Sequence, residues 1–451
     1  MSEQRARAAG PPDLLSGPIL PLLLRFAWPN IVAMLAVALA AMAETRYVGQ
    51  FGPAALAGMA LVFPFVMLQN MLSAGAMGGG VSSAVSRALG AGDAQRANAL
   101  AVHALWIGVA AGGCYMLLMW LLGPWFMSLL GGNGEALAHA LAYSQVAFSG
   151  SVFLWLLNTL SSVVRGSGNM RVPSATLISV ALAQVVLGGA LGLGWWSGTP
   201  WGMRGVAAGG VLAQAAGAAF LWFYLAAGRG KLRLRVRATP LVRHHLLDIL
   251  RVGALACASP LQTVLTILIL TRLVAWFGTE ALAGYGIGTR LEFLLVPIAF
   301  AIGVASVPMV GMAIGAGQID RARQVAWTAA ALATVLLGCL GLGVAWMPEV
   351  WTMLFTDEPA VLQASATYFR WAGPFYGLFG LGLALYFASL GAGQAAGPVM
   401  AGTLRLVVVA LGGSALALAQ GPVWSIFALV GVGMAVYGIS MVWFVRRTPW
   451  G

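Results

Sequence analysis

The chain has 451 residues, of which 60% are hydrophobic and only 8% are charged. Soluble domains carry roughly 25% charged residues, so this composition excludes a protein whose surface mostly faces water. The 24 Lys and Arg residues outnumber the 12 Asp and Glu residues, but the basic side chains lie in short loops between apolar runs. The excess of positive charge therefore reports membrane topology, and we expect no nucleic-acid partner.

Twelve apolar runs follow one another along the chain, and each is long enough for a helix that crosses a bilayer. Such a helix needs about 20 mostly apolar residues, and the 60 glycines suit closely packed membrane helices. The chain is therefore predicted to be an all-α integral membrane protein with twelve transmembrane helices. The expected spans are 18–48, 54–84, 97–122, 136–163, 172–196, 204–227, 246–276, 281–312, 323–346, 361–390, 397–419 and 422–445.

Loop charges predict the orientation of these spans. The densest basic run extends from Arg229 through Arg237 to Arg243, between the sixth and seventh spans. Because positive loops stay in the cytoplasm, this run is expected there, together with both chain termini. We accordingly predict an N-terminal six-helix bundle at 1–228, a basic cytoplasmic linker at 229–245 and a C-terminal six-helix bundle at 246–451.

The two groups of six spans carry an internal repeat. Six spans separate the copies, so both halves have the same orientation in the membrane, and we expect a parallel repeat about an axis near the membrane normal. The matching pairs, 226 or 225 residues apart, are Thr45-Arg46 with Thr271-Arg272, Phe51-Gly52 with Phe277-Gly278, Ala55-Leu56-Ala57-Gly58 with Ala281-Leu282-Ala283-Gly284, Gly90-Ala91-Gly92 with Gly315-Ala316-Gly317, and Gly166, Gly168 and Pro173 with Gly391, Gly393 and Pro398.

The cysteines indicate neither a disulfide framework nor a metal site. Cys114, Cys257 and Cys339 are odd in number, lie in apolar spans and have no CxxC or His-rich context. We treat them as packing residues and expect no metal.

Several segments resemble the multidrug and toxic compound extrusion (MATE) transporters. The segment from Glu44 to Gly49, followed by Phe51-Gly52, is similar to the end of their first helix and their first outer loop. The segment from Arg87 to Asp93 is similar to their first long cytoplasmic loop, and that from Arg165 to Asn169 to the turn into their fifth helix. The similarity extends over nearly the whole chain.

This resemblance implies two six-helix bundles around a central cavity and transport by alternating access. It implies a secondary-active antiporter, acting as a monomer in the cell inner (plasma) membrane. Its substrates would be small organic compounds, cationic or amphipathic, exported against inward flow of protons or sodium. Apart from that coupling ion, the resemblance implies no cofactor.

The resemblance also indicates where the coupling acid lies. Family members usually carry an aspartate where Glu44 stands. Many members of one branch carry an Asn and an Asp in helix five, and these positions correspond to Gln184 and Gly188 here. Other branches carry a glutamate in helix seven. Residues 252–276 contain no acid, and Gln262 is the nearest polar candidate there. The chain is therefore nearer the branch with its coupling acid in the first helix.

Glu44 lies five residues before Gly49, about 8 Å below the outer loop at 1.5 Å per residue. An acid within a span tends to face the bundle interior or a wet cavity, and burial disfavours its charged form. We interpret Glu44 as an ion-coupling residue; the alternative is a side chain that reaches the membrane interface.

Glu292 is a second candidate for ion coupling. It lies eleven residues into the eighth span, near the middle of a core roughly 30 Å thick. The alternative is a structural ion pair with Arg370 or Arg405.

The remaining candidates are a hinge and a set of polar side chains. Pro29 removes a backbone hydrogen bond from the first span and is interpreted as a hinge, with a static kink as the alternative. Polar side chains inside spans are predicted to line the substrate cavity, although contacts between helices are an equal explanation. They are Gln69, Asn70, Asn158, Gln184 and Gln262.

Two other functions compete with export. A lipid-linked oligosaccharide flippase of the same superfamily would need a cavity lined by several cationic residues, for which the chain offers Arg272, Arg290, Arg370 and Arg405. A membrane-embedded enzyme would need paired acids or histidine clusters, and the chain has no DxxD, HxxxD or HExxH pattern.

Overall fold

The computed structural model describes residues 14–196, 198–236 and 239–450, and it places these residues in helices joined by short turns. Arg237 of the predicted basic linker lies outside the described residues. The helices of the first half are α2 (Ile19–Gly49), α3 (Pro53–Asn70), the π-helix η2 (Met71–Met77), α4 (Gly78–Gly90), α5 (Ala94–Leu129), α6 (Gly134–Ser149), α7 (Ser151–Gly166), α8 (Arg171–Gly192) and α9 (Gly202–Ala226).

The second half repeats this order. Its helices are α10 (Arg243–Ala256), α11 (Ala258–Ala275), α12 (Thr279–Gly315), α13 (Ile319–Trp346), α14 (Glu349–Thr352), α15 (Pro359–Ala372), the 3-10 helix η4 (Gly373–Phe375), α16 (Tyr376–Gly391), α17 (Ala396–Leu418) and α18 (Val423–Arg447).

The predicted fold class is confirmed. Eleven helices in the described part of the chain are long and apolar enough to cross a membrane, and α6 with α7, bent by 47°, brings the number to twelve. Several helices run farther than predicted: the second span reaches Gly90 instead of residue 84, and the third begins at Ala94 and ends at Leu129. These helices continue until a glycine turn stops them, and hydropathy alone does not mark that point.

Glycines with positive φ occupy equivalent turns in the two halves. Gly52 has φ +100° and Gly278 φ +98°, while Gly92 has +77° and Gly317 has +74°. Gly168 and Gly393 form a third pair, with φ of +83° and +78°. A side chain would be strained in this conformation, so the repeated glycines preserve the same turn in each copy.

The change of spacing from 226 to 225 residues has a structural cause. The first copy has one residue more than the second between its outer and inner glycine turns, and this stretch contains the π-helix Met71–Met77. In the second copy the same stretch lies within the unbroken α-helix α12. A single extra residue inside a helix is accommodated as a π-helical turn, so the insertion lies in the second span.

Two glycines bring the halves together at a point of near two-fold symmetry. A Cβ on Gly90 of α4 would lie 2.8 Å from the Met312 Cα of α12, and a Cβ on Gly315 of α12 would lie 2.9 Å from the Ala91 backbone nitrogen. Side chains at these positions would collide with the opposite backbone, so α4 and α12 can cross closely only with glycine at both.

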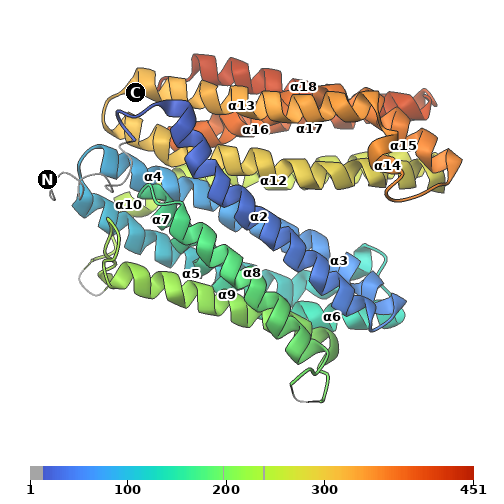
Figure 1. The fold of residues 1–451 in the computed structure, drawn as a ribbon, viewed down its shortest axis with the longest axis horizontal. Coiled ribbons are helices and arrows are strands. Elements are labelled where there is room, and N and C mark those ends of the chain that lie inside the picture. Colours follow the sequence, from blue (N-terminus) through green and yellow to red (C-terminus); the bar gives the residue numbers. More distant parts are fainter. Residues whose placement is uncertain (1–13, 197, 237–238, 451) are drawn as a thin grey trace, which may run out of the picture.

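Two spans cross between the bundles. In Figure 1, α2 runs diagonally from the bundle that holds α12 and α13 to the bundle that holds α3 and α8. In the seventh span, α10 packs on α4 and α5 of the first half, whereas α11 packs on α17 of the second half. The bundles converge at the end that holds both termini and diverge toward the opposite end (Figure 1).

The orientation of the chain and the boundaries of its three parts stay predictions. We predict that a cysteine at Asn133, at the diverging end, reacts only with reagent outside the cell, and that a cysteine at Leu241, 54% exposed, reacts only from the cytoplasm. An impermeant maleimide applied to oriented vesicles measures this, in a variant without the three natural cysteines. Labelling of Asn133 from the cytoplasmic side alone would contradict the topology.

Candidate functional site

A cavity of about 300 Å³ lies on the face of the second bundle that meets the first. The helices α11, α12, α16, α17 and α18 form most of its wall, and α3 and η2 close it from the first half. Aromatic and apolar side chains predominate in this wall, while Glu292 and Arg405 are the charged residues among those that line it. Such a cavity has the size and character of a site for small organic molecules.

Glu292 of α12 is held by a tyrosine from another helix. The Tyr368 hydroxyl of α15 donates a hydrogen bond to Glu292 Oε1. The Tyr368 ring is fully buried and makes edge contacts with Tyr285 and Phe427, at centroid distances of 5.6 and 5.4 Å. The surrounding rings therefore fix the hydroxyl, and the hydroxyl orients the carboxylate within the cavity.

Arg405 of α17 faces the same cavity without an acidic partner. Its guanidinium carbon lies 5.7 Å from the Phe379 ring centre and 5.9 Å from that of Tyr437. Its Nε is buried and has no hydrogen-bond partner among the described residues. Both ion pairs in the described structure involve Asp248, so Glu292 forms no ion pair within 4 Å with Arg405 or Arg370 in this conformation, although the charges of Glu292 and Arg405 attract each other.

Gln262 of α11 is the one of the five predicted polar residues that lines this cavity. Its Nε2 donates to Thr403 Oγ1 at 2.8 Å, while its Oε1 is buried and has no hydrogen-bond partner within the described chain. The amide is therefore fixed by α17.

Glu44 and Gln184 come together inside the first bundle, away from this cavity. Glu44 of α2 is 5% exposed, and the Gln184 side chain of α8 lies beside its carboxylate. A Cβ on Gly210 of α9 would lie 3.7 Å from Glu44 Oε1, so α9 packs directly against the acid. Glu44 is therefore buried between α2, α8 and α9.

Gln69, Asn70 and Asn158 take different positions around the π-helix. Asn158 of α7 donates from Nδ2 to Ser73 Oγ at 2.8 Å, and that hydroxyl donates to the Gln69 carbonyl at 2.8 Å. The Gln69 side chain is buried and its Nε2 has no partner in the described part of the chain. Asn70 is exposed and donates to the Val66 carbonyl of its own helix. Asn158 therefore joins α7 to the π-helix, and none of the three residues lines the cavity of the second bundle.

The predicted hinge lies in an unbroken helix. Pro29 stands inside α2, which continues from Ile19 to Gly49. The buried Asn30 beside it donates to the Phe26 carbonyl at 3.3 Å and accepts from Ser174 Oγ of α8 at 3.1 Å. The hinge therefore stays a prediction, with the neighbouring asparagine tying α2 to α8.

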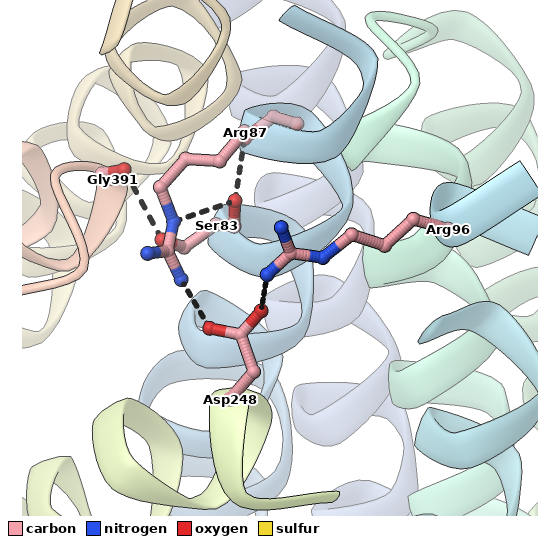
Figure 2. A network of polar contacts seen from close by, with 6 residues as sticks. Ser83, Arg87, Arg96, Asp248 and Gly391 are labelled. Carbon is pink, nitrogen blue, oxygen red and sulfur yellow. Dashed lines mark hydrogen bonds and ion pairs between the residues drawn. The ribbon is translucent and has the colours of Figure 1, made fainter. Parts of the chain in front are cut away.

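Polar contacts close the end of the molecule that holds the termini. Figure 2 shows Asp248 of α10 between Arg87 of α4, at 3.1 Å, and Arg96 of α5, at 2.8 Å. In the same view Ser83 Oγ of α4 donates to the Gly391 carbonyl of α16 at 3.1 Å. The first contacts attach the start of the seventh span to the first bundle, and the last joins the two halves directly.

Close backbone packing continues this closure toward the cavity. A Cβ on Gly80 of α4 would lie 2.7 Å from the backbone nitrogen of Gly253 in α10, and one on Gly79 would lie 2.6 Å from Leu390 Cδ1 of α16. The cavity therefore ends where the glycines of α4 let the two halves touch.

Sequence reasoning missed the tyrosines of the cavity and the Asp248 network. Tyr368 lies 76 residues from Glu292, and a tyrosine in an apolar span gives no pattern that separates a carboxylate partner from a packing residue. Asp248 follows the basic linker, so the sequence shows an acid close to many arginines. Its actual partners, Arg87 and Arg96, lie more than 150 residues away and could not be identified from that pattern. The change in repeat spacing from 226 to 225 residues is the sequence signal for the π-helix.

Fold and cavity together define a polytopic transporter built from two repeated bundles. The MatE family model matches residues 29–188 and 255–415, which is most of the chain and one match in each half. The chain therefore belongs to the MatE family of MATE transporters. Because this is a family of transporters, the chain is not an enzyme.

Two curated proteins and one solved structure illustrate these similarities. The chain is 25% identical over 382 residues to the FAD transporter of Shewanella oneidensis, covering 83% of this chain and 82% of that protein. It is 26% identical over 344 residues to the probable multidrug resistance protein NorM of Thermotoga maritima, covering 76% and 74%. A structure described as the outward-facing conformation of a multidrug resistance MATE family transporter matches with a TM-score of 0.86, at 22% identity and 96% coverage of both chains.

We predict that Asp248→Asn loosens the closed end. Hydrogen bonds to charged groups contribute about 1.5 to 3 kcal/mol each, and the partial exposure of both arginines puts the loss near the lower value. A cysteine at Ser86, which is fully buried where α4 meets α12, should react several-fold faster with a permeant maleimide in this variant.

Asp320→Asn is the matched control, because Asp320 is an exposed acid at the same end with no ion pair in the described structure. Equal labelling rates for Asp248→Asn, Asp320→Asn and the parent protein would show that the network does not hold this end closed.

Proposed function

We propose that this MATE-family exporter moves organic, amphipathic compounds out of the cell across the inner (plasma) membrane, driven by inward flow of protons or sodium. The observation that carries the proposal is the aromatic-lined cavity of about 300 Å³ between two repeated bundles that are closed at one end. Its wall suits molecules with apolar rings better than small hydrated solutes.

Alternating access has a structural basis in the glycine crossing of α4 and α12. The contacts at Gly90 and Gly315 are related by the repeat, so each half presents the same surface to the other. Parallel halves of this kind can rock about their common interface and expose the cavity first to one side and then to the other. When the cavity opens toward the converging end of the bundles, the contacts of Asp248 with Arg87 and Arg96 would have to break.

Glu44 is the proposed site of ion coupling. It is a buried acid without an ion pair in the described structure, in a helix that contacts both halves. Gain and loss of a proton there would change the charge enclosed by α2, α8 and α9, and hence the energy of moving α2 near Pro29. Sodium bound by the carboxylate and the Gln184 oxygen is the alternative form of the same coupling.

Glu292 supports a positive charge on the substrate. Its carboxylate lies in the cavity wall, and aromatic rings nearby can hold a cation over their faces. The same carboxylate is the second candidate for ion coupling. Competition between substrate and coupling ion for one acid would link the two movements.

A flippase for lipid-linked oligosaccharides receives less support. Of the four arginines that could have formed a cationic cavity, Arg272, Arg290 and Arg370 are exposed and only Arg405 lies in the wall. One guanidinium beside one carboxylate does not make the strongly basic surface that a pyrophosphate-linked lipid would need.

We predict that Glu44→Gln abolishes efflux driven by a pH gradient in proteoliposomes, while some substrate binding remains and no longer varies with pH. The amide has the shape of the acid and can still hydrogen-bond the neighbouring Gln184 side chain, but it cannot exchange a proton at neutral pH. Glu44→Asp should keep partial transport. A fluorescent organic cation serves as the transported compound, and a sodium gradient replaces the pH gradient in a parallel measurement.

Glu135→Gln is the control, because Glu135 is an exposed acid in the first turn of α6. Efflux by Glu44→Gln at the parent rate with unchanged pH dependence would rule out coupling at Glu44 and direct the search to Glu292.

A further inference from the structure

Arg405 is an unusual residue for its position. It lies about midway along α17, where a charged side chain is costly to insert into a bilayer. A structural arginine at such a depth is normally neutralised by an acid or by backbone carbonyls. Its Nε has no hydrogen-bond partner in residues 14–196, 198–236 and 239–450, and neither ion pair found there includes it.

The charged groups that face Arg405 leave its charge without direct compensation. Glu292 is the acid in the cavity wall and its charge attracts Arg405, but the two form no ion pair within 4 Å, and the Glu292 carboxylate already accepts a hydrogen bond from Tyr368. The other helices that line the cavity contribute no charged side chain to it. A positive group therefore faces the cavity with its hydrogen-bonding capacity unused.

The surroundings of Arg405 indicate what would use that capacity. Phe379 and Tyr437 lie within 6 Å of the guanidinium carbon and hold the group by cation–π contacts. A planar guanidinium fixed in this way can donate two parallel hydrogen bonds to a carboxylate, phosphate or sulfonate. The apolar remainder of the wall, with Met71, Phe293 and Phe300, suits an aromatic body attached to that anionic group.

We propose that Arg405 binds an anionic group of the substrate, so that the cavity accepts aromatic organic anions and zwitterions as well as cations. This inference rests on the proposed export function, since it assigns a substrate class to the same cavity. Glu292 would hold any positive group of a zwitterion.

The test compares two dyes that share a xanthene ring but differ in charge, fluorescein as the anion and rhodamine 123 as the cation. Their affinities for the purified full-length protein in detergent are measured by fluorescence anisotropy, at a mildly alkaline pH where fluorescein is ionised. Loss of a charge-assisted, two-point contact should weaken fluorescein binding to Arg405→Gln by about tenfold or more. Rhodamine 123 should bind as before or more tightly, because a repelling charge is gone.

Arg290→Gln is the matched control. Arg290 lies two residues from Glu292 on α12, but it is exposed and its guanidinium carbon lies over Phe355 instead of the cavity. Arg405→Lys should retain part of the fluorescein affinity, because lysine keeps the positive charge but cannot donate the two parallel hydrogen bonds of a guanidinium. Arg405→Met, which keeps the apolar stem, provides the same comparison if the glutamine variant does not fold.

Equal weakening of both dyes by Arg405→Gln and Arg405→Met, or no change for fluorescein, would overturn the anion site and leave Arg405 as a packing residue. Transport by the parent protein in proteoliposomes separates this result from the proposed function. Export of rhodamine 123 with no charge-selective effect of Arg405 refutes the anion site alone. Charge-selective binding without export of either dye supports the anion site and refutes the exporter.

Discussion

The crossing of α4 and α12 is the contact on which the rest of the structure depends. Backbone meets backbone there because Gly90 and Gly315 have no side chains, and each lies against the equivalent stretch of the other half. With the bundles joined closely at this end, their divergence toward the other end leaves the cavity between them. Any movement that exposes the cavity to the opposite side must change this crossing, since interfaces packed so tightly deform by switching between discrete arrangements.

Much of this architecture was predictable because it rests on composition and repetition. The twelve spans follow from apolar run length, and the parallel repeat follows from the constant spacing of turns such as Gly52 with Gly278 and Gly168 with Gly393, whose φ angles agree within 5°. Both signals can be read along the sequence without knowing which distant helices are in contact. The break of the seventh span at Cys257 and the crossing of α10 to the first bundle were not predictable, because both depend on which surfaces of distant helices complement each other.

The candidate site was predicted less well, for the same reason. Polar residues inside spans were correctly identified as unusual, yet only Gln262 and Glu292 among the predicted site residues face the cavity, while Asn158 and Gln69 meet around the π-helix and Gln184 meets Glu44. Hydropathy shows that a polar residue lies in a span. It does not show which of the surrounding helices, or which cavity, that residue faces. The partners of Glu292 and Asp248 lie 76 to 161 residues away, so only the fold brings them together.

The repeat also shows how the two halves divide their work. Glu44 corresponds to Leu270 in the second copy, whereas Glu292 corresponds to Val66 and Arg405 to Val180 in the first. Backbone turns and glycine contacts are thus duplicated, but each of the three charged residues proposed to act in transport occurs in one copy alone. If coupling and binding were duplicated, substituting one copy would leave the other active. Under the proposed function, the first bundle would therefore couple an ion through Glu44, and the second would bind a charged group through Glu292 and Arg405. Their effects must then meet at the shared elements, which are α2, in contact with both bundles, and the π-helical segment that forms part of the cavity wall.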